Sequence, residues 1–495
     1  MAHQLFNGRF VMKRERLEEF EHIFNPRSVA VIGASQGDSF TESLIGTRMK
    51  ENLFLVNPKY KELFGKRCYA SILDIEEGID YVVIAVPAPV VLDVLRECIE
   101  KRVKAAHLFT SGFSETGIEE GVKLEDEVKE TARGKIRLIG PNCMGVYCSK
   151  SGLSFNPEAS TEEGSVGVIS QSGTFADLFL DIGKIRNIKF SKAISYGNAI
   201  DLDCPDFLEC LAEDPETKVI ALYIEGTRNG ERLKSALWKA AREKPVVALK
   251  GGVTEHGGRA ASSHTGSLAG SPETWRSLFK QAGAVQVESF DELVDTILAF
   301  TCSPLPFGNG VSIITNSGGF SVMETDICVK AGLEVPQFRE ETMRELREVV
   351  PAAGTSIRNP LDAWPIYYIG PETLSNAIKV IALDENIHSL VLHIDELRYM
   401  KHTWGGALED RLKELLTSMV NACQYARDEI KKPVMICVSL EAYSEDEEDR
   451  RYHIMVKKVF ESKGFPVYPS LDGAIKALFN LYRYHRMTGP LTNQG

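Results

Sequence analysis

The sequence predicts an α/β protein in which parallel β-sheets are covered by helices on both faces. Short, near-continuous apolar runs recur along the chain, and such runs are typical of strands buried on both faces of a parallel sheet. Stretches with helical periodicity separate these runs, as in repeated strand–helix–strand units. The pattern starts anew twice, so the 495 residues are expected to form three domains.

The first domain is expected to be a βαβ domain of Rossmann type. A helix predicted over residues 16–24 precedes its strands, and helical patterns over 90–102 and 119–132 lie between them. The predicted strands cover residues 28–32, 53–56, 81–86, 105–110 and 136–139.

The second and third domains repeat the same alternation. The stretch 302–310 is rich in proline and glycine and is typical of a linker. We therefore predict domains over residues 1–149, 150–304 and 305–495. The predicted strands of the last two domains cover residues 165–170, 193–195, 219–224 and 246–250, and then 311–315, 389–394 and 434–438.

The composition argues against certain classes of binding partner and indicates the cellular compartment. The chain carries a formal net charge of −12 and has no long basic run, which argues against nucleic acid and anionic membrane surfaces. No apolar run approaches the roughly 20 residues of a membrane span, and the first residues lack the apolar segment of a secretory signal. The ten cysteines show neither C-x-x-C nor zinc-ligand spacing, so we expect no metal site and a reducing cytoplasm.

Each predicted domain opens with a strand, a turn of small residues and a helix. The three turns cover residues 31–35, 169–174 and 314–319. Glycine permits a tight turn and a close approach by phosphate, and the helix dipole favours an anion there. One such turn alone is equally consistent with a plain capped turn, but three in corresponding positions favour at least one phosphate site. The first turn lacks the G-x-G-x-x-G pattern, which argues against NAD.

The segment 257–270 is the most informative part of the sequence. It consists of small and polar residues around a single imidazole, His264. Long loops of this kind are often functional, and a neutral imidazole is a good nucleophile near neutral pH. An ordinary loop histidine remains the alternative. His256 is a competitor, but its neighbour Glu255 is typical of a surface turn.

An imidazole nucleophile needs a partner that orients one ring nitrogen and leaves the other available. Glu225 directly follows the predicted strand 219–224, and the carboxyl ends of parallel strands face the active-site crevice. A capped, solvated carboxylate is the alternative for Glu225. The histidines 107, 388 and 393 lie in or beside apolar strands, where core or surface roles are more common.

Together these segments resemble the α-type subunit of ADP-forming acetate–CoA ligases, also called NDP-forming acyl-CoA synthetases. That family is related to the α subunit of succinyl-CoA synthetase. The resemblance runs from about residue 17 to about residue 486, and the histidine segment is its most specific part. The matching segments are SVAVIGAS (28–35), VNPKY (56–60), YVVIAVP (81–87), SGFSETG (111–117), IGPNCMGV (139–146), VISQSGTF (168–175), YGNAIDLD (196–203), AEDPETKVIALYIEG (212–226), GRAASSHTGSLAG (258–270), TNSGGF (315–320) and NPLD (359–362).

The resemblance implies a Rossmann-type CoA-binding domain followed by two flavodoxin-like CoA-ligase domains. It implies that His264 carries a phosphoryl group and that Glu225 orients the imidazole. The helix that begins at Ser172 would receive the phosphohistidine through its N-terminal N–H groups. The phosphate-binding residues would be Ser170, Gln171, Ser172, Gly173 and Thr174. The residues lining the CoA site would be Gly33, Ala34, Ser35, Lys59, Pro87, Gly112 and Asn142.

The implied reaction converts acyl-CoA, phosphate and ADP into a free acid, CoA and ATP. In the family an ATP-grasp portion binds ADP or ATP with Mg²⁺, and this sequence has no segment that resembles it. The resemblance therefore implies a separate β-type subunit in an α₂β₂ assembly. The sequence departs from the family over 37–46, where glycines are replaced, and in 196–203, which lacks an acidic residue after the asparagine.

Two other functions remain open at this point. The chain could be a CoA- or acyl-CoA-binding regulatory protein on the same scaffold without ligase activity, or another CoA-dependent enzyme. An intact His264, Glu225 and phosphate-binding turn favour the ligase, because a regulatory protein has no need of a reactive histidine.

Overall fold

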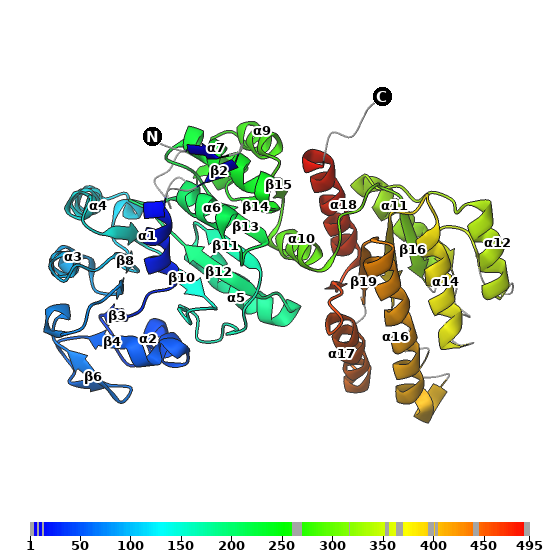
Figure 1. Ribbon diagram of the computed structural model, residues 1–495, viewed down its shortest axis with the longest axis horizontal. Helices are drawn as coiled ribbons and strands as arrows, with labels where there is room; N and C mark the ends of the chain where they lie inside the picture. The colour runs from blue at the N-terminus through cyan, green and yellow to red at the C-terminus, as the bar shows by residue number, and fades with distance from the viewer. Residues whose placement is uncertain are drawn as a thin grey trace. The chain divides into compact units, whose positions relative to one another are not determined.

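The computed structural model describes residues 4–6, 9–11, 14–259, 270–315, 317–351, 356–362, 370–394, 400, 404–438 and 445–489, with side chains from residue 16 onward. The chain forms two compact units, Met1–Glu288 and Ser289–Gly495 (Figure 1). Among the described residues, no helix combines the length and the hydropathy that a membrane span requires.

The first sheet has seven strands in the order β5-β6-β4-β3-β7-β8-β9, and all of its pairings except β5–β6 are parallel. Without β5, this is the 3-2-1-4-5-6 order of the Rossmann fold, with a switch point between β3 and β7. The strands are β3 (Val29–Ile32), β4 (Leu53–Val56), β5 (Glu62–Leu63), β6 (Lys66–Tyr69), β7 (Tyr81–Ile84), β8 (Ala105–Leu108) and β9 (Arg137–Ile139).

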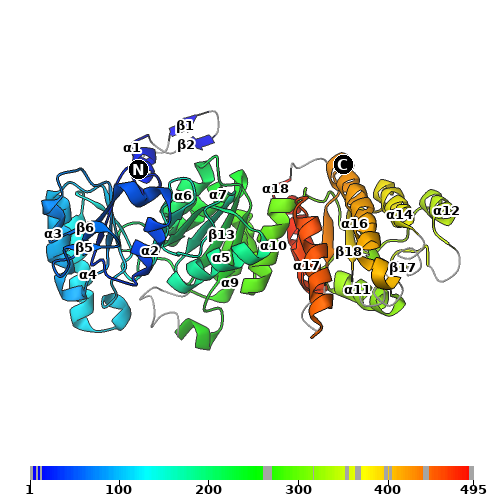
Figure 2. The ribbon, with the colours of Figure 1, turned by 90° about the horizontal axis from the view of Figure 1, so that it is seen from below.

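Four helices accompany this sheet. Helices α3 and α4 pack against each other on the side away from the second sheet, as both views show (Figure 2). A short hairpin, β1 (Gln4–Phe6) and β2 (Arg9–Val11), precedes the first helix. The helices are α1 (Arg14–Phe24), α2 (Ser39–Ile45), α3 (Val91–Glu100) and α4 (Glu119–Ala132).

The second sheet belongs to the same unit and has the order β10-β12-β11-β13-β14-β15. Its five parallel strands follow the flavodoxin order 2-1-3-4-5, with a switch point between β11 and β13. Strand β10 pairs antiparallel with β12 at the edge. The strands are β10 (Gly145–Cys148), β11 (Val166–Ser170), β12 (Phe190–Ser195), β13 (Val219–Ile224), β14 (Val246–Lys250) and β15 (Val285–Val287), and the helices are α5 (Gly173–Arg186), α6 (Cys204–Glu213), α7 (Gly230–Glu243) and α9 (Pro272–Ala282).

The second unit contains a five-stranded parallel sheet, β17-β16-β18-β19-β20, which again has the 2-1-3-4-5 order. Helices α12, α14 and α16 lie side by side in this unit, and α11 packs on α18. The strands are β16 (Val311–Thr315), β17 (Leu361–Asp362), β18 (Ser389–His393), β19 (Val434–Cys437) and β20 (Val467–Tyr468), and the helices are α10 (Phe290–Cys302), α11 (Gly318–Ala331), α12 (Glu340–Val349), α14 (Pro371–Leu383), α16 (Leu408–Gln424), α17 (Glu447–Glu461) and α18 (Leu471–Thr488).

Every run predicted as a strand overlaps a strand of the structure, although β12 begins at Phe190, three residues before the predicted run 193–195. These strands are buried at almost every position because helices cover both faces, which is why their sequences are continuous apolar runs. The strands β5, β6, β15, β17 and β20 were not predicted, since they are short and most of them are interrupted by polar residues.

Strand β10 was also not predicted, and it matters for the arrangement of the first unit. It falls inside the predicted domain 1–149, yet it pairs with β12 of the second sheet. The end of the first predicted domain is thereby joined to the second sheet by main-chain hydrogen bonds. The two domain boundaries themselves remain predictions.

Candidate functional site

The switch point of the second sheet brings two predicted site residues into direct contact. Gln171 follows β11 and Glu225 follows β13, and these two strands are neighbours in the sheet. The Gln171 side-chain oxygen accepts hydrogen bonds from the backbone N–H groups of Glu225, at 2.8 Å, and Gly226, at 3.1 Å. Both side chains are more than nine-tenths buried. Gln171 therefore fixes the backbone from which the Glu225 carboxylate projects.

The Glu225 carboxylate is held at one oxygen. The Tyr223 hydroxyl donates to its Oε1 at 3.1 Å, and Tyr223 in turn stacks on Phe175 of α5 with ring centroids 4.1 Å apart. Burial, together with the charge of Glu225, raises the pKa of the Tyr223 phenol, so the hydroxyl keeps its proton. The other oxygen, Oε2, is buried and has no hydrogen-bond partner among the described residues. It is thus an acceptor that suits an incoming N–H donor.

The first turn of α5 points its backbone N–H groups toward the same edge of the sheet. Ser172 caps the helix, with its side chain accepting from the Phe175 N–H at 3.4 Å. The N–H groups of Gly173 and Thr174 belong to the first turn and therefore have no intrahelical acceptor. Together with the positive end of the helix dipole, they form an anion-binding position.

A cavity of about 270 Å³ lies at this helix terminus. It joins the predicted phosphate-binding turn to Asn142 of the predicted CoA site, and so brings the two predicted sites together. Gly173 packs against Met144: a Cβ atom on Gly173 would lie 3.0 Å from the Met144 Cγ. The cavity is lined by Phe109, Asn142, Cys143, Met144, Gln171, Ser172, Gly173, Thr174, Gly197 and Asn198.

The other residues predicted for CoA follow the carboxyl ends of strands in the first sheet. Gly33 and Pro87 follow β3 and β7, on either side of the switch point. Gly33 has a φ of +96°, and a Cβ atom there would lie 2.2 Å from the Ala85 carbonyl oxygen. Only glycine fits this close approach of the two strand ends. Lys59 is exposed after β4, and Gly112 follows β8 on the same edge.

Two of the predicted CoA turns already use their backbone N–H groups. The Asp38 carboxylate accepts from the N–H of Ser35 at 2.9 Å, while its second oxygen caps α2 at Thr41. The Glu115 carboxylate accepts from the N–H of Gly112 at 2.6 Å. These amides are therefore not free for the phosphates of CoA. Of the residues predicted for CoA, Lys59 has an exposed ammonium group and Asn142 lines the cavity.

Asn198 connects the two halves of the first unit beside the cavity. Its side-chain amide donates to Glu115 at 2.7 Å and to Glu125 at 3.0 Å. Arg228, which follows β13, donates to Glu125 at 3.1 Å. Arg228 offsets the charge of Glu125, and the bonds from Asn198 hold the Gly112 turn against the second sheet. Sequence reasoning missed this network because its members are far apart in the chain.

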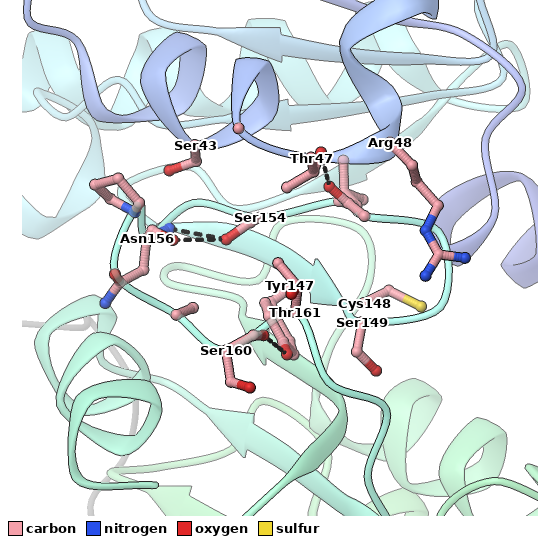
Figure 3. Close-up of a pocket in the computed structure, with 15 residues that line it drawn as sticks. Ser43, Thr47, Arg48, Tyr147, Cys148, Ser149, Ser154, Asn156, Ser160 and Thr161 are labelled. Atoms are coloured by element: carbon pink, nitrogen blue, oxygen red, sulfur yellow. Dashed lines mark hydrogen bonds between the residues drawn. The ribbon is translucent and has the colours of Figure 1, made fainter. Parts of the chain in front are cut away.

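A second cavity, of about 290 Å³, lies between α2 and the segment that follows β10 (Figure 3). Hydroxyl groups line it, and several of them donate to backbone oxygens. Thr47 donates to the Gly152 oxygen at 2.7 Å, and Tyr147 donates to the Ser160 oxygen at 2.6 Å. None of the predicted site residues lines this cavity. The first cavity is therefore the candidate site.

The histidines complete the comparison with the sequence predictions. His264 lies outside the described residues. His256 is exposed and contacts Arg259, in agreement with a surface role. His107 is buried and bonded to the Cys143 oxygen at 2.8 Å, and burial lowers its pKa to about 4. A histidine with so low a pKa is neutral at physiological pH and serves here to pack the core.

Three family models match successive parts of the chain. Residues 27–149 match the CoA binding domain, residues 163–300 the succinyl-CoA ligase like flavodoxin domain, and residues 311–476 the ligase-CoA domain. These matches confirm the predicted fold class, a Rossmann-type CoA-binding domain followed by two flavodoxin-like ligase domains.

Relatives of known activity are similar over most of the chain. The ADP-forming acetate–CoA ligase I subunit alpha of Pyrococcus furiosus is 33% identical over 478 residues, covering 94% of this chain and 98% of that one. The corresponding II subunit alpha is 39% identical and covers 75% and 81%. The chain spans only 49% of the Methanocaldococcus jannaschii ligase, at 43% identity, and 64% of the Archaeoglobus fulgidus ligase I, at 35%.

Solved structures agree with this similarity. A dinucleotide-forming acetyl-coenzyme A synthetase of Korarchaeum cryptofilum, solved with phosphate and ADP, is 28% identical with a TM-score of 0.80. The match covers 95% of this chain and 97% of that one. A protein of Pyrococcus horikoshii is 31% identical with a TM-score of 0.79 and covers 95% and 100%.

The Gln171 contact yields a test of the site's construction. Gln171→Ala leaves the buried N–H groups of Glu225 and Gly226 without their acceptor, so we expect a loss of about 2 kcal/mol in the free energy of unfolding. Urea denaturation measures this loss. The matched control is Gln281→Ala at an exposed position of α9, which should stay within about 0.5 kcal/mol of wild type. Equal stability of the two variants would contradict the assigned role.

Proposed function

We propose that this chain, which belongs to the family of ADP-forming acetate–CoA ligases, is the CoA-binding part of an NDP-forming acyl-CoA synthetase. We also propose that it carries the phosphohistidine of that enzyme. The proposed reaction is acyl-CoA + phosphate + ADP = acid + CoA + ATP. The observation that carries the proposal is the cavity in which Asn142 meets the N-terminus of α5. A thioester and a phosphate must come together in this reaction, and the cavity offers one position for both.

In the proposed reaction, a phosphate oxygen attacks the acyl carbonyl carbon of acyl-CoA. The C–S bond breaks, and CoA leaves as a thiolate that takes up a proton. A nitrogen of His264 then attacks the phosphorus of the acyl phosphate, the bond from phosphorus to the acyl oxygen breaks, and the acid leaves as a carboxylate. The phosphoryl group finally passes to a terminal oxygen of ADP, which regenerates the imidazole.

The residues of the candidate site have distinct parts in this proposal. The N–H groups of Gly173 and Thr174 bind the phosphate, because their charge distribution favours an anion before and after the transfer. The Oε2 of Glu225, which has no hydrogen-bond partner among the described residues, accepts a hydrogen bond from the ring N–H of His264 and stabilises the positive charge that develops on the ring. Gln171 and Tyr223 keep that carboxylate in one orientation.

We propose that nucleotide binding resides on an ATP-grasp β-type subunit that holds ADP or ATP with Mg²⁺, in an α₂β₂ assembly. Support comes from the relative named subunit alpha, of which this chain covers 98%. We place the activity in the cytoplasm, because the ten cysteines are free and nine of them are buried, as is typical of proteins kept in a reducing compartment.

Phosphorylation of the chain tests this function directly. Wild type is incubated with acetyl-CoA and phosphate, and separately with an ATP-grasp β-type subunit and ATP, and intact mass is measured. We expect a gain of one phosphoryl group that His264→Ala abolishes and the exposed control His256→Ala retains. CoA affinity should be equal in all three proteins. CoA binding without phosphorylation in either mixture would favour the regulatory alternative.

Glu225→Gln tests the orienting carboxylate. The amide keeps the size of the side chain but loses the charge that stabilises the imidazole, so the rate constant of phosphorylation should fall about 100-fold. Rapid-quench measurement of acid-labile phosphate gives this rate constant. The control is Glu231→Gln, at an exposed position of α7, which should leave the rate unchanged. A Glu225→Gln rate within a few-fold of wild type would remove Glu225 from the mechanism.

A further inference from the structure

Lys250 is a buried lysine that the proposed reaction does not yet use. It is the last residue of β14 and pairs in register with Ile224, the residue before Glu225. Only 4% of its surface is exposed. An ammonium group costs free energy when it is buried unless its hydrogens find acceptors, so a residue that served packing alone would be apolar.

The contacts of the Lys250 ammonium centre on Glu225. The Nζ atom donates to the Glu225 carbonyl oxygen at 2.7 Å and also to the Gly251 carbonyl oxygen. It lies 5.0 Å from the centre of the Trp275 ring, within the range of a cation–π interaction. Burial lowers the pKa of Lys250, and the charge of Glu225 acts against this effect. The Glu225 backbone is thus held from two sides, by Gln171 at its N–H and by Lys250 at its carbonyl.

Two glycines, one before and one after the stretch 260–269, lie close to the residues around Lys250. On the N-terminal side, a Cβ atom on Gly251 would lie 2.6 Å from the Tyr223 hydroxyl and 3.3 Å from the Glu225 Cγ. On the C-terminal side, a Cβ atom on Gly270 would lie 2.9 Å from the Trp275 Nε1. Lys250 therefore joins the backbone of Glu225 to the Trp275 ring of α9, on the C-terminal side of that stretch.

We infer that Lys250 is a positioning residue for the phosphoryl relay: it fixes the backbone of Glu225 and joins it to helix α9, which follows the segment that carries His264. This inference rests on the proposed function, because it assigns Lys250 a part in the orientation of the same carboxylate. The orientation of the Glu225 carboxylate matters for the rate, since a misplacement of a reacting group by about 1 Å can slow a reaction about 100-fold.

Lys250→Met tests the inference. We expect the rate constant of phosphorylation to fall about 10- to 100-fold, with CoA affinity within two-fold of wild type by calorimetry. Lys250→Arg keeps the charge and the donors and should recover part of the rate. If methionine prevents folding, Lys250→Gln provides the same comparison, because it keeps an N–H donor and loses the charge.

The matched control is Lys192→Met in β12 of the same sheet. Lys192 is equally buried and pairs with Asp214 at 2.8 Å and Glu216 at 2.9 Å. Its loss should lower the melting temperature and leave the phosphorylation rate of the folded protein unchanged. If Lys192→Met slows phosphorylation as much as Lys250→Met does, the effect is one of general stability and the inference is wrong.

A double variant separates positioning from a merely structural role. If Lys250 acts through Glu225, Lys250→Met combined with Glu225→Gln should be about as slow as Glu225→Gln alone. Rate losses that multiply would overturn the inference while leaving the proposed function intact. A wild-type chain that is phosphorylated neither from acetyl-CoA and phosphate nor from ATP with a β-type subunit would overturn the proposed function, and this inference with it.

Discussion

Parallel strand pairing is the constraint on which the candidate site depends. In a parallel sheet every strand ends on the same edge, and at a switch point two neighbouring strands send their connections to opposite faces. Gln171 and Glu225 follow the two strands on either side of such a point in the second sheet. Their hydrogen bond is possible only because β11 and β13 are neighbours. The helix α5 begins two residues after Gln171, and the end of β11 therefore also places the N-terminus of α5 at this edge of the sheet.

The electrostatics of the first unit explain how an acidic chain can be suited to anionic ligands. Carboxylates near the predicted CoA edge do not face the cavity as free charges, since Asp38 and Glu115 are bonded to backbone N–H groups of their own turns. The first turn of α5 carries no acidic residue, and its N–H groups remain directed to the cavity. The net charge of −12 therefore says little about the local field at the site.

The sequence predicted the fold class and the strand ends well, because burial on both faces produces apolar runs that can be read directly. It also placed Glu225 correctly at the end of β13. It could not reveal that the Gln171 side chain bonds to that strand end, or that Lys250 and Tyr223 contact Glu225. The bonds from Gln171 and Lys250 reach the Glu225 backbone from neighbouring strands, and no local pattern encodes them. The role of His264 stays a prediction, because that residue lies outside the described residues.

We propose that one cavity receives both the thiol end of CoA and the phosphate. The most direct test is a crystal structure of this chain grown with CoA and inorganic phosphate. We expect CoA to lie along the carboxyl edge of the first sheet with its sulfur beside Asn142, and a phosphate to bind the N–H groups of Gly173 and Thr174. A CoA sulfur far from Asn142 would contradict this proposal. A phosphate bound elsewhere, with none at the N-terminus of α5, would also contradict it.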